Sequence, residues 1–353
     1  MSETSALPAA GAARVAALLT RYRERVLAAL RETVDGAGVG YAGYMRYHFG
    51  WQDAAGNPIA EAAGKMLRPA LCLLCCEAVG GDAARALPAA VALELVHNFT
   101  LIHDDIEDSS DTRHGRTTLW RVAGIPQAIN TGDGMFVLAH RTLLRLADAG
   151  VAADRVLDAV RALDDACVGL CDGQHADIGF EGTAHVTLEQ YEAMVAGKTA
   201  ALLGASAAVG AIAGGAEARA VDAFGACGRR LGMAFQVQDD VLGIWGDAGT
   251  TGKPVADDIR SRKKSFPVVY ALGSLPTAER ERLRTVYEQP SLGEDDVALV
   301  LRLLEAAGAR DASAQAAKRW AAAALDAVRE VEMHPDRRAD IEALAAFFVD
   351  RSA

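Results

Sequence analysis

The sequence predicts an all-helical protein, and three observations point to this fold class. Alanine, the strongest helix former, recurs in runs such as residues 199–213. Aromatic residues make up only 6% of the chain, and no stretch of useful length alternates apolar and polar residues as a β-strand does. Apolar residues instead recur every three or four positions, the spacing of one helix face. A chain of 353 residues is long enough to bury a large helical core.

Glycines, prolines and polar stretches divide this pattern into helices. The first predicted helix covers residues 12–33. Pro69 lies in the first turn of the next helix, and Pro88 in the first turn of a long helix over residues 87–108. After a polar loop at 109–126, the predicted helices cover residues 127–147, 152–175, 188–213, 216–245, 267–275, 277–287, 295–307, 312–331 and 336–348. No linker interrupts them, so we expect a flexible tail at residues 1–10 and a single domain over residues 11–353.

Charge and cysteine content exclude several classes of protein. The chain carries 36 Lys and Arg against 47 Asp and Glu, a net charge of -11, which argues against a nucleic-acid-binding protein. Cys72 and Cys75 form one C-x-x-C pair, but no second pair completes a zinc site. With Cys76 they lie among leucines at helical spacing, so we expect buried thiols and a cytoplasmic protein. We find no signal peptide, and no apolar run reaches the ~20 residues of a transmembrane segment.

Two predicted helices end in aspartates. In the first, Asp104 and Asp108 are four residues apart and share one helix face, with Asp105 beside them. These like charges repel each other and lie at the negative end of the helix dipole, so the cluster implies a missing cation. Carboxylates with open positions suit Mg²⁺, which also takes phosphate oxygens. For this cluster alone, a solvated, charged helix end is the alternative.

The second cluster, Asp239 and Asp240, also follows an apolar helix and precedes a glycine-bearing loop. Its fifth position is Gly243, so it has one carboxylate fewer than the first cluster. Two such ends can face each other across a helical bundle and hold metal ions between them. Asp247, in the following loop, is a candidate to compensate for Gly243 through a water molecule.

Basic residues lie near both clusters, as two bound diphosphates would require. Lys65 and Arg68 precede a helix start, where backbone N–H groups favour an anion. His97 lies seven residues before Asp104 and therefore on the same helix face. The other cations near the clusters are Arg113, Arg116, Lys198, Lys253 and residues 262–264. Each alone is an ordinary surface charge, and only their joint placement favours a binding site.

These residues form the ordered motifs G-K-x-x-R-P, H-x-x-x-x-x-H-D-D-x-x-D, R-x-G-R, G-K-T, F-Q-x-x-D-D and G-K-P. The set resembles the trans-isoprenyl diphosphate synthase (polyprenyl synthetase) family over residues 64–267, and most of all its geranylgeranyl diphosphate synthases. The resemblance implies the isoprenoid synthase fold, a single-domain bundle of about ten or more helices around a central prenyl-binding cavity. It also implies a magnesium-dependent, homodimeric prenyltransferase that condenses isopentenyl diphosphate head to tail with an allylic diphosphate.

The resemblance assigns roles to single residues as well. The ligands of three Mg²⁺ ions would be Asp104, Asp108 and Asp239, with Asp105 and Asp240 in support. The allylic diphosphate would be held by Arg113, Lys198, Lys253 and Lys263. Isopentenyl diphosphate would be held by Lys65, Arg68 and His97. Thr199 and Gln236 would line the region where positive charge develops, and Gln174 would lie near the chain-binding cavity.

Two positions depart from the family's pattern. His114 replaces the second of two arginines, which normally contacts isopentenyl diphosphate, and either His114 or Arg116 would have to take over this contact. Gly243 replaces the third aspartate of the second motif. We expect activity to survive because the first aspartate of that motif carries most of the metal binding in the family.

Product length would depend on the depth of the cavity below the first cluster. Phe99 and Thr100 lie five and four positions before Asp104, a pattern that resembles C20 synthases with a bulky floor at Phe99. A C15 (farnesyl) product is the alternative. Two other functions also stay open: a class I terpene cyclase, which would not need the second diphosphate site, and a non-catalytic regulatory subunit, which only His114 and Gly243 support.

Overall fold

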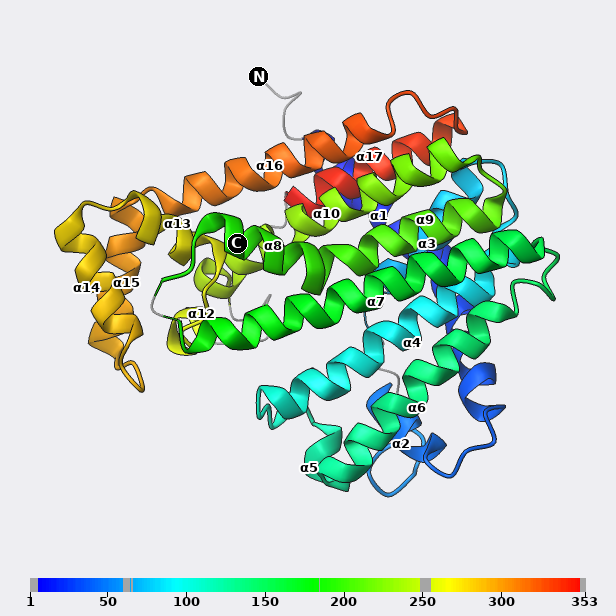
Figure 1. Cartoon of the computed structure of the whole chain (residues 1–353), viewed down its shortest axis with the longest axis horizontal. Helices are drawn as coiled ribbons and strands as arrows, with labels where there is room; N and C mark the ends of the chain where they lie inside the picture. The colour runs from blue at the N-terminus through cyan, green and yellow to red at the C-terminus, as the bar shows by residue number, and fades with distance from the viewer. Residues whose placement is uncertain (1–5, 60–63, 65, 184, 248–254, 350–353) are drawn as a thin grey trace.

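The computed structural model describes residues 6–59, 64, 66–183, 185–247 and 255–349. Within these ranges the chain is almost entirely helical, which confirms the predicted fold class (Figure 1). The first half contains α1 (Ala6–Asp35), α2 (Ala42–His48), α3 (Leu67–Ala78), α4 (Ala83–Glu107), α5 (Leu119–Ala123), α6 (Ile125–Leu144) and α7 (Ala153–Glu181). The second half contains α8 (Leu188–Val195), the π-helix η1 (Ala196–Ala200), α9 (Ala201–Gly214), α10 (Ala218–Trp245), α12 (Asp257–Arg260), α13 (Phe266–Ser274), α14 (Thr277–Tyr287), α15 (Glu294–Ala306), α16 (Ala309–Ala327) and α17 (Pro335–Val349).

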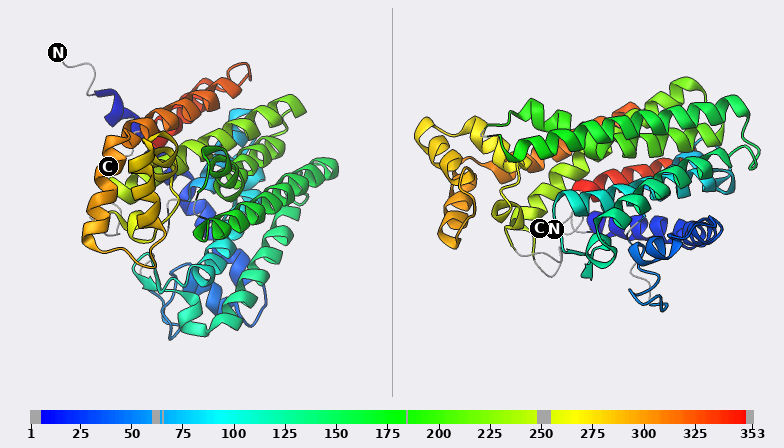
Figure 2. Two further views of the ribbon diagram at one scale, coloured as in Figure 1. Left: turned by 60° about the vertical axis from the view of Figure 1, so that its left-hand side comes forward. Right: turned by 60° about the horizontal axis from the view of Figure 1, so that its bottom comes forward.

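The long helices lie side by side and share one apolar core. Helix α10 packs on α9 and α16, while α4 packs on α6, α3 and α9. Leu74, Leu93 and Leu95, fully buried, belong to this core. Helices α12 to α15 lie at one end of the bundle, where they surround a separate apolar cluster (Figures 1 and 2). The two acidic helix ends, those of α4 and α10, therefore belong to the central helices.

Two helical stretches, α4 and Leu188–Gly214, are long and apolar enough to cross a membrane by length and composition alone. Within the fold, 67% and 78% of their apolar windows are buried against other helices. Such burial is the arrangement of core helices, because a lipid-facing helix leaves its apolar side chains exposed.

The starts of two helices, α1 and α4, differ from the sequence-based prediction. Helix α1 begins at Ala6, so residues 6–10 of the expected tail are helical, while residues 1–5 lie outside the described part of the chain. Pro88 lies inside α4 rather than in its first turn, because the Asp82 carboxylate caps the helix earlier by accepting from the Ala84 N–H at 2.8 Å. Pro88 has no backbone N–H to donate to the Ala84 carbonyl four residues earlier. Ala84 is exposed, so water can bond to this carbonyl instead.

The expected loop after α4 contains a short hairpin. Strands β1 (Thr112–Arg113) and β2 (Arg116–Thr117) pair antiparallel. Both residues of its two-residue turn have positive φ, 51° at His114 and 73° at Gly115, as a type I′ turn requires. Two-residue strands are too short to give a period-2 signal, so composition could not predict them.

Candidate active site

A cavity of about 240 Å³ opens where the ends of α4 and α10 meet, and it gathers residues that are far apart in the sequence. Its walls come from α3, α4, α7, η1, α9 and α10. The lining residues are Arg68, His97, Thr100, Leu101, Asp104, Leu170, Gln174, Lys198, Thr199, Leu202, Phe235, Gln236 and Asp239. About half of the predicted site residues that the structure describes are in this set, and both acidic clusters contribute one carboxylate.

Within the first cluster, only part of the carboxylate set is available to a ligand. Asp105 is buried and accepts a hydrogen bond from Arg113 Nε at 2.8 Å, so it supports the hairpin rather than the cavity. The side chains of Asp104 and Asp108 make no hydrogen bond or ion pair with another described residue. Burial, together with Asp108 and Glu107, raises the pKa of Asp104 to about 6 although Lys198 opposes it, and the pKa of Asp108 is raised in the same way. Lys198 and Arg113 therefore offset the charge of these two carboxylates only in part.

In the second cluster, too, one aspartate is buried and bonded to the protein while the other faces the cavity. Asp240 is 0% exposed and accepts hydrogen bonds from Tyr191 Oη at 2.6 Å, from the Phe266 N–H at 2.8 Å and from Gln236 Nε2 at 2.9 Å. These partners saturate its carboxylate, so Asp240 holds helices together. Asp239 is exposed and lines the cavity, which makes it the ligand candidate of the pair.

The carboxylates fit a metal ion that is shared with a substrate. In the described ranges, no group of three or more His, Cys, Asp or Glu side chains could hold a metal ion without other ligands. Mg²⁺ is usually held by one or two carboxylates together with substrate phosphates and water. Asp104 and Asp239 line one cavity from two helices, with Asp108 one turn further along α4, and this arrangement matches that requirement rather than that of a structural metal.

Lys198 points into the cavity from the π-turn η1. At this turn the helix that runs from α8 to α9 contains one extra residue. Its ammonium lies 2.5 Å from Asp177 Oδ2 on α7. The turn packs so closely on α7 that a Cβ at Gly173 would lie 2.1 Å from the Lys198 backbone N. Glycine is therefore required at this crossing, and the close contact fixes the position of Lys198. Single π-turns inside helices are frequent at functional sites.

Beside Lys198, a chain of hydrogen bonds sets the orientation of two polar side chains. The Thr199 hydroxyl donates to Gln236 Oε1 at 2.8 Å, and Gln236 Nε2 donates to Asp240 Oδ1 at 2.9 Å. Because the buried carboxylate takes the amide N–H, the carbonyl oxygen of Gln236 is held toward Thr199. Both oxygens then border the cavity, where they can stabilise positive charge.

The opposite wall is basic. Arg68 is half-buried, and its buried Nε has no hydrogen-bond partner in the described part of the protein. Burial, with Arg68 and Arg113 nearby, lowers the pKa of His97 well below its usual value, so its imidazole is neutral. An unpaired, buried guanidinium N–H is costly unless an anion completes it, and this wall therefore suits a phosphate group.

Three further cations have defined positions. Arg113 is held by Asp105 on the hairpin, as described above. Lys263, in the turn after α12, lies 3.4 Å from Asp240 Oδ1. Arg116 instead stacks on the Tyr47 ring at 4.5 Å and donates to the Gln52 carbonyl at 3.2 Å. Two predicted cations, Lys65 and Lys253, lie outside the described residues.

The comparisons with known proteins agree with this geometry. A model of the polyprenyl synthetase family matches residues 50–304. The chain belongs to the polyprenyl synthetase family. A (2E,6E)-farnesyl diphosphate synthase of Mycobacterium tuberculosis (strain ATCC 25618 / H37Rv) is 39% identical over 344 residues, 96% of this chain and 94% of the relative. A geranylgeranyl diphosphate synthase of the same strain is 40% identical over 321 residues, 91% of this chain and 90% of the relative.

Solved structures support the family assignment. A polyprenyl synthetase from Streptomyces coelicolor A3(2) is 40% identical with a TM-score of 0.89, and the alignment covers 95% of this chain and 99% of that one. A geranylgeranyl pyrophosphate synthase from Corynebacterium glutamicum, complexed with isoprenyl diphosphate and magnesium, is 25% identical with a TM-score of 0.77 and 98% coverage of both chains. This polyprenyl synthetase is therefore a prenyltransferase that elongates trans-prenyl diphosphates, and its family uses a divalent metal.

Several residues that support the synthase site were not predicted from the sequence. Asp177 lies three residues after Gln174 and pairs with Lys198, and this spacing on one helix face was the available signal. Glu94 lies behind Arg68, where Asn98 Nδ2 donates to its Oε1 at 2.9 Å, and His48 lies 3.1 Å from Asn98 Oδ1. Glu94 and Asn98 are four residues apart on α4, but no sequence pattern places His48 of α2 or Arg68 of α3 beside them.

Two predicted residues of the synthase take positions that differ from the simplest expectation. Phe99 is not among the residues that line the cavity, whereas Thr100 is. The Phe99 ring instead packs edge-on against Phe136 of α6 with centroids 5.0 Å apart. His114 is exposed at the hairpin turn, near enough to His97 to lower the pKa of that imidazole, whereas Arg116 is anchored on Tyr47.

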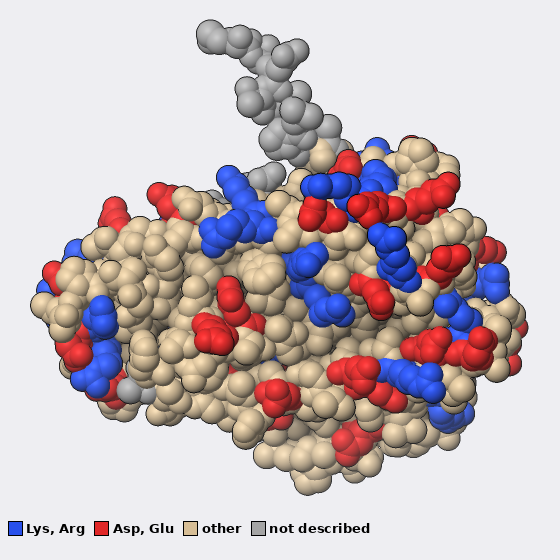
Figure 3. Space-filling view, turned by 45° about the horizontal axis from the view of Figure 1, so that its top comes forward, with Lys and Arg blue, Asp and Glu red and all other residues tan. Residues whose placement is uncertain are grey.

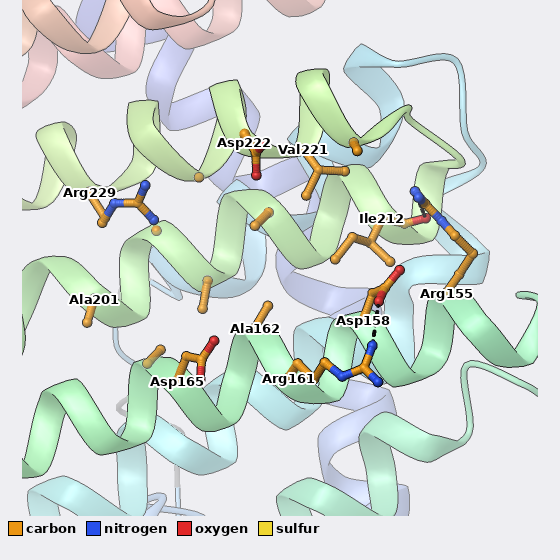
Figure 4. Close-up of a pocket in the computed structure, with 16 residues that line it drawn as sticks. Arg155, Asp158, Arg161, Ala162, Asp165, Ala201, Ile212, Val221, Asp222 and Arg229 are labelled. Atoms are coloured by element: carbon orange, nitrogen blue, oxygen red, sulfur yellow. Dashed lines mark hydrogen bonds and ion pairs between the residues drawn. The ribbon is translucent and has the colours of Figure 1, made fainter.

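The described residues also line hollows away from the acidic helix ends. One of about 540 Å³ lies between α7, α9 and α10, lined by small side chains and by both Arg and Asp (Figure 4). Asp158 and Arg161 at its rim pair with each other at 3.1 Å. Acidic and basic side chains are also mixed over the face in Figure 3.

Proposed function

We propose that this synthase makes geranylgeranyl diphosphate (C20) by adding isopentenyl diphosphate to shorter allylic diphosphates, with three Mg²⁺ ions in each site. The observation that carries the chain length is Phe99, which lies five residues before Asp104 with its ring against Phe136. This aromatic pair closes the space between α4 and α6 more than one helical turn from the acidic end. A prenyl chain that grows from the acidic end along α4 meets this pair.

The allylic diphosphate would lie at the acidic end of the cavity. Asp104, Asp108 and Asp239 would hold the metal ions, and Lys198, Arg113 and Lys263 would contact phosphate oxygens. Bound Mg²⁺ would neutralise the negative charge that develops on the diphosphate as its C–O bond breaks. Positioned charge of this kind is usually the largest contribution to catalysis.

Isopentenyl diphosphate would lie against the basic wall. The half-buried Arg68 guanidinium and a neutral His97 imidazole would donate hydrogen bonds to its phosphates. The oxygens of Thr199 and Gln236, held by Asp240, would face the allylic cation. Leu101, Leu170 and Leu202 would exclude water, which would otherwise quench that cation.

Product analysis tests this proposal. The purified protein is incubated with Mg²⁺, labelled isopentenyl diphosphate and each short allylic diphosphate, and the products are separated by mass. We expect C20 to dominate, and Phe99→Ala to shift products beyond C20 because the floor is removed. A native product that stops at C15, or a Phe99→Ala variant with unchanged product length, would contradict the C20 assignment. A cyclic hydrocarbon from a single allylic substrate would indicate a cyclase instead.

We also propose a homodimer through α5, α6 and α7. Most of the large apolar side chains that are exposed in the described residues lie on these helices: Val122, Ile125, Ile129, Val137, Leu144, Leu157, Val168 and Ile178. A second copy would bury this stripe, since contiguous exposed apolar surface usually marks an interface. By mass photometry we expect Val168→Asp, which adds charge to a side chain that is 72% exposed, to yield monomers. The matched control Leu188→Asp, on α8, should leave the dimer intact, and an unchanged dimer in Val168→Asp would contradict the proposal.

A further inference from the structure

The carbonyl oxygen of Gln174 is a buried acceptor that the described protein does not satisfy. Gln174 is 8% exposed and lines the cavity, yet its Oε1 has no hydrogen-bond partner in the described ranges. Leu170, four residues earlier on the same face of α7, also lines the cavity, so this helix face looks into it. A buried polar atom without a partner costs free energy, and in a native site it calls for a ligand or a catalytic role.

Glu107 sets the orientation of this amide. Gln174 Nε2 donates to Glu107 Oε2 at 2.6 Å, a contact that joins α7 to the end of α4. A carboxylate at neutral pH accepts hydrogen bonds but does not donate them, so it takes the N–H side of the amide and turns the carbonyl oxygen away from itself. Glu107 is not among the predicted metal ligands, although it precedes Asp108 in the chain. Its contact thus leaves an acceptor with both lone pairs available at the cavity.

A close helix crossing fixes Gln174 beside the residues assigned to the developing positive charge. Gln174 follows Gly173, which packs so closely on η1 that an added Cβ would lie 2.1 Å from the Lys198 backbone N. Thr199, Gln236 and Gln174 line the same cavity from η1, α10 and α7. The Gln236 carbonyl oxygen already accepts from the Thr199 hydroxyl, whereas that of Gln174 accepts from no described residue.

The hydrocarbon part of an allylic diphosphate offers this oxygen no N–H or O–H group. A complementary charge appears only when the allylic C–O bond breaks. The electron pair of that bond leaves with the diphosphate, and the allylic carbon stays positive until the double bond of isopentenyl diphosphate supplies a new electron pair and a proton is lost. An oxygen that is already in place stabilises this transition state more than the bound substrate, which is the condition for faster chemistry.

We propose that Gln174 is a further catalytic residue, whose carbonyl oxygen stabilises the allylic cation, and that Glu107 is the positioning residue that fixes its amide. The inference deepens the proposed function, because it rests on the placement of the allylic diphosphate at the acidic end of the cavity. It does not depend on the length of the product.

Two analogues of geranyl diphosphate separate stabilisation of the cation from binding of the substrate. In one, a protonated amine replaces the carbon that becomes positive, and in the other, a bridging sulfur prevents ionisation and leaves the chain neutral. Calorimetry with Mg²⁺ gives the Kd of each analogue, and rapid-quench kinetics give the single-turnover rate of elongation. In Gln174→Leu we expect this rate and the affinity for the amine analogue to fall by about 10- to 100-fold, as for other contacts to charged groups. The Kd of the neutral analogue should stay within about twofold, because its chain makes no hydrogen bond to the amide.

Two changes at Glu107 test the positioning role. Glu107→Gln removes the charge but keeps an acceptor for Gln174 Nε2, and we expect it to keep the preference for the amine analogue over the neutral one. Glu107→Leu removes the acceptor, so that the amide can turn, and the preference should fall by about 3- to 10-fold. The matched control for the first variant is Gln315→Leu, the same exchange at an exposed position of α16, which should leave the rate and both affinities unchanged.

An equal loss of affinity for both analogues in Gln174→Leu would trace its effect to packing or metal binding and overturn the proposal. Native affinity for the amine analogue in this variant would overturn it as well. Equal results in Glu107→Gln and Glu107→Leu would refute the positioning role. If Gln174→Leu does not fold, Gln174→Met, which keeps the length of the side chain, is measured in its place. A native protein that prefers the amine analogue but makes no C20 product would refute the proposed function while leaving this comparison intact.

Discussion

The crossing of α7 and the π-turn gives the sharpest prediction, because one methyl group should displace a catalytic cation. In Gly173→Ala the new Cβ would lie 2.1 Å from the Lys198 backbone N and 2.8 Å from the Met194 carbonyl oxygen. The first of these distances must open by at least 0.9 Å to reach the 3.0 Å limit of real contacts. Overpacking of this kind costs about 1–3 kcal/mol of unfolding free energy. A shift of about 1 Å in a positioned group lowers the rate by about 100-fold.

The assay is steady-state kcat/KM with an allylic diphosphate and isopentenyl diphosphate, together with unfolding by urea. Gly179→Ala is the matched control, because it makes the same change in the same helix where no atom lies within 4 Å of the new Cβ. We expect this control to keep its activity and to gain about 0.5–1 kcal/mol of stability, since alanine favours the helix over glycine. If Gly173→Ala retains kcat/KM within about twofold of the native protein, the reasoning about this crossing is refuted.

Three further predictions follow from single contacts. Tyr191→Phe removes the 2.6 Å hydrogen bond to the buried Asp240 carboxylate and should lower the unfolding free energy by about 1.5–3 kcal/mol, measured in urea; a smaller loss than for an exposed Tyr→Phe change would contradict the role of Asp240. Asp104→Asn should abolish elongation yet stabilise the metal-free protein by about 3 kcal/mol at pH 7, because burial raises the pKa of this carboxyl from 3.8 to about 6. Because of this raised pKa, the metal-free folded protein binds the proton at a higher pH than the unfolded chain does. The unfolding free energy of the native protein in EDTA should therefore rise as pH falls from 7 toward 4. This rise should be smaller in Asp104→Asn. Arg116→Met removes the contact with the Tyr47 ring and should cost about 0.5–2 kcal/mol of stability while the KM for isopentenyl diphosphate stays the same; a large rise in that KM would show that Arg116 does replace the missing arginine.

The sequence predicts the helices well because most of them bury a continuous apolar face. The pattern over residues 188–213 delimits the helical stretch from α8 to α9, but it does not reveal the π-turn, since the extra residue arises from a close contact with Gly173 on another helix. Pro88 misled the prediction of the start of α4, because the Asp82 cap lies six residues earlier and proline near a helix start is ambiguous.

At the candidate site, residue types and spacing alone do not tell which member of each aspartate pair faces the cavity, whereas the family resemblance assigns the ligand role to Asp104 and Asp239. The structure turns Asp105 toward Arg113 and buries Asp240, while Asp104 and Asp239 line the cavity. Neighbouring side chains separate in this way because one helical step is a rotation of about 100°.

The central claim is that Asp104, Asp108 and Asp239 bind divalent ions together with the allylic diphosphate. Anomalous diffraction from crystals grown with Mn²⁺ and a non-hydrolysable allylic diphosphate tests it most directly, because Mn²⁺ shares the oxygen-rich coordination of Mg²⁺. We predict anomalous peaks that contact the side chains of α4 and α10 from opposite sides of the bound diphosphate. A diphosphate bound in the cavity with manganese on only one helix, or with none beside Asp104 and Asp239, would contradict the account.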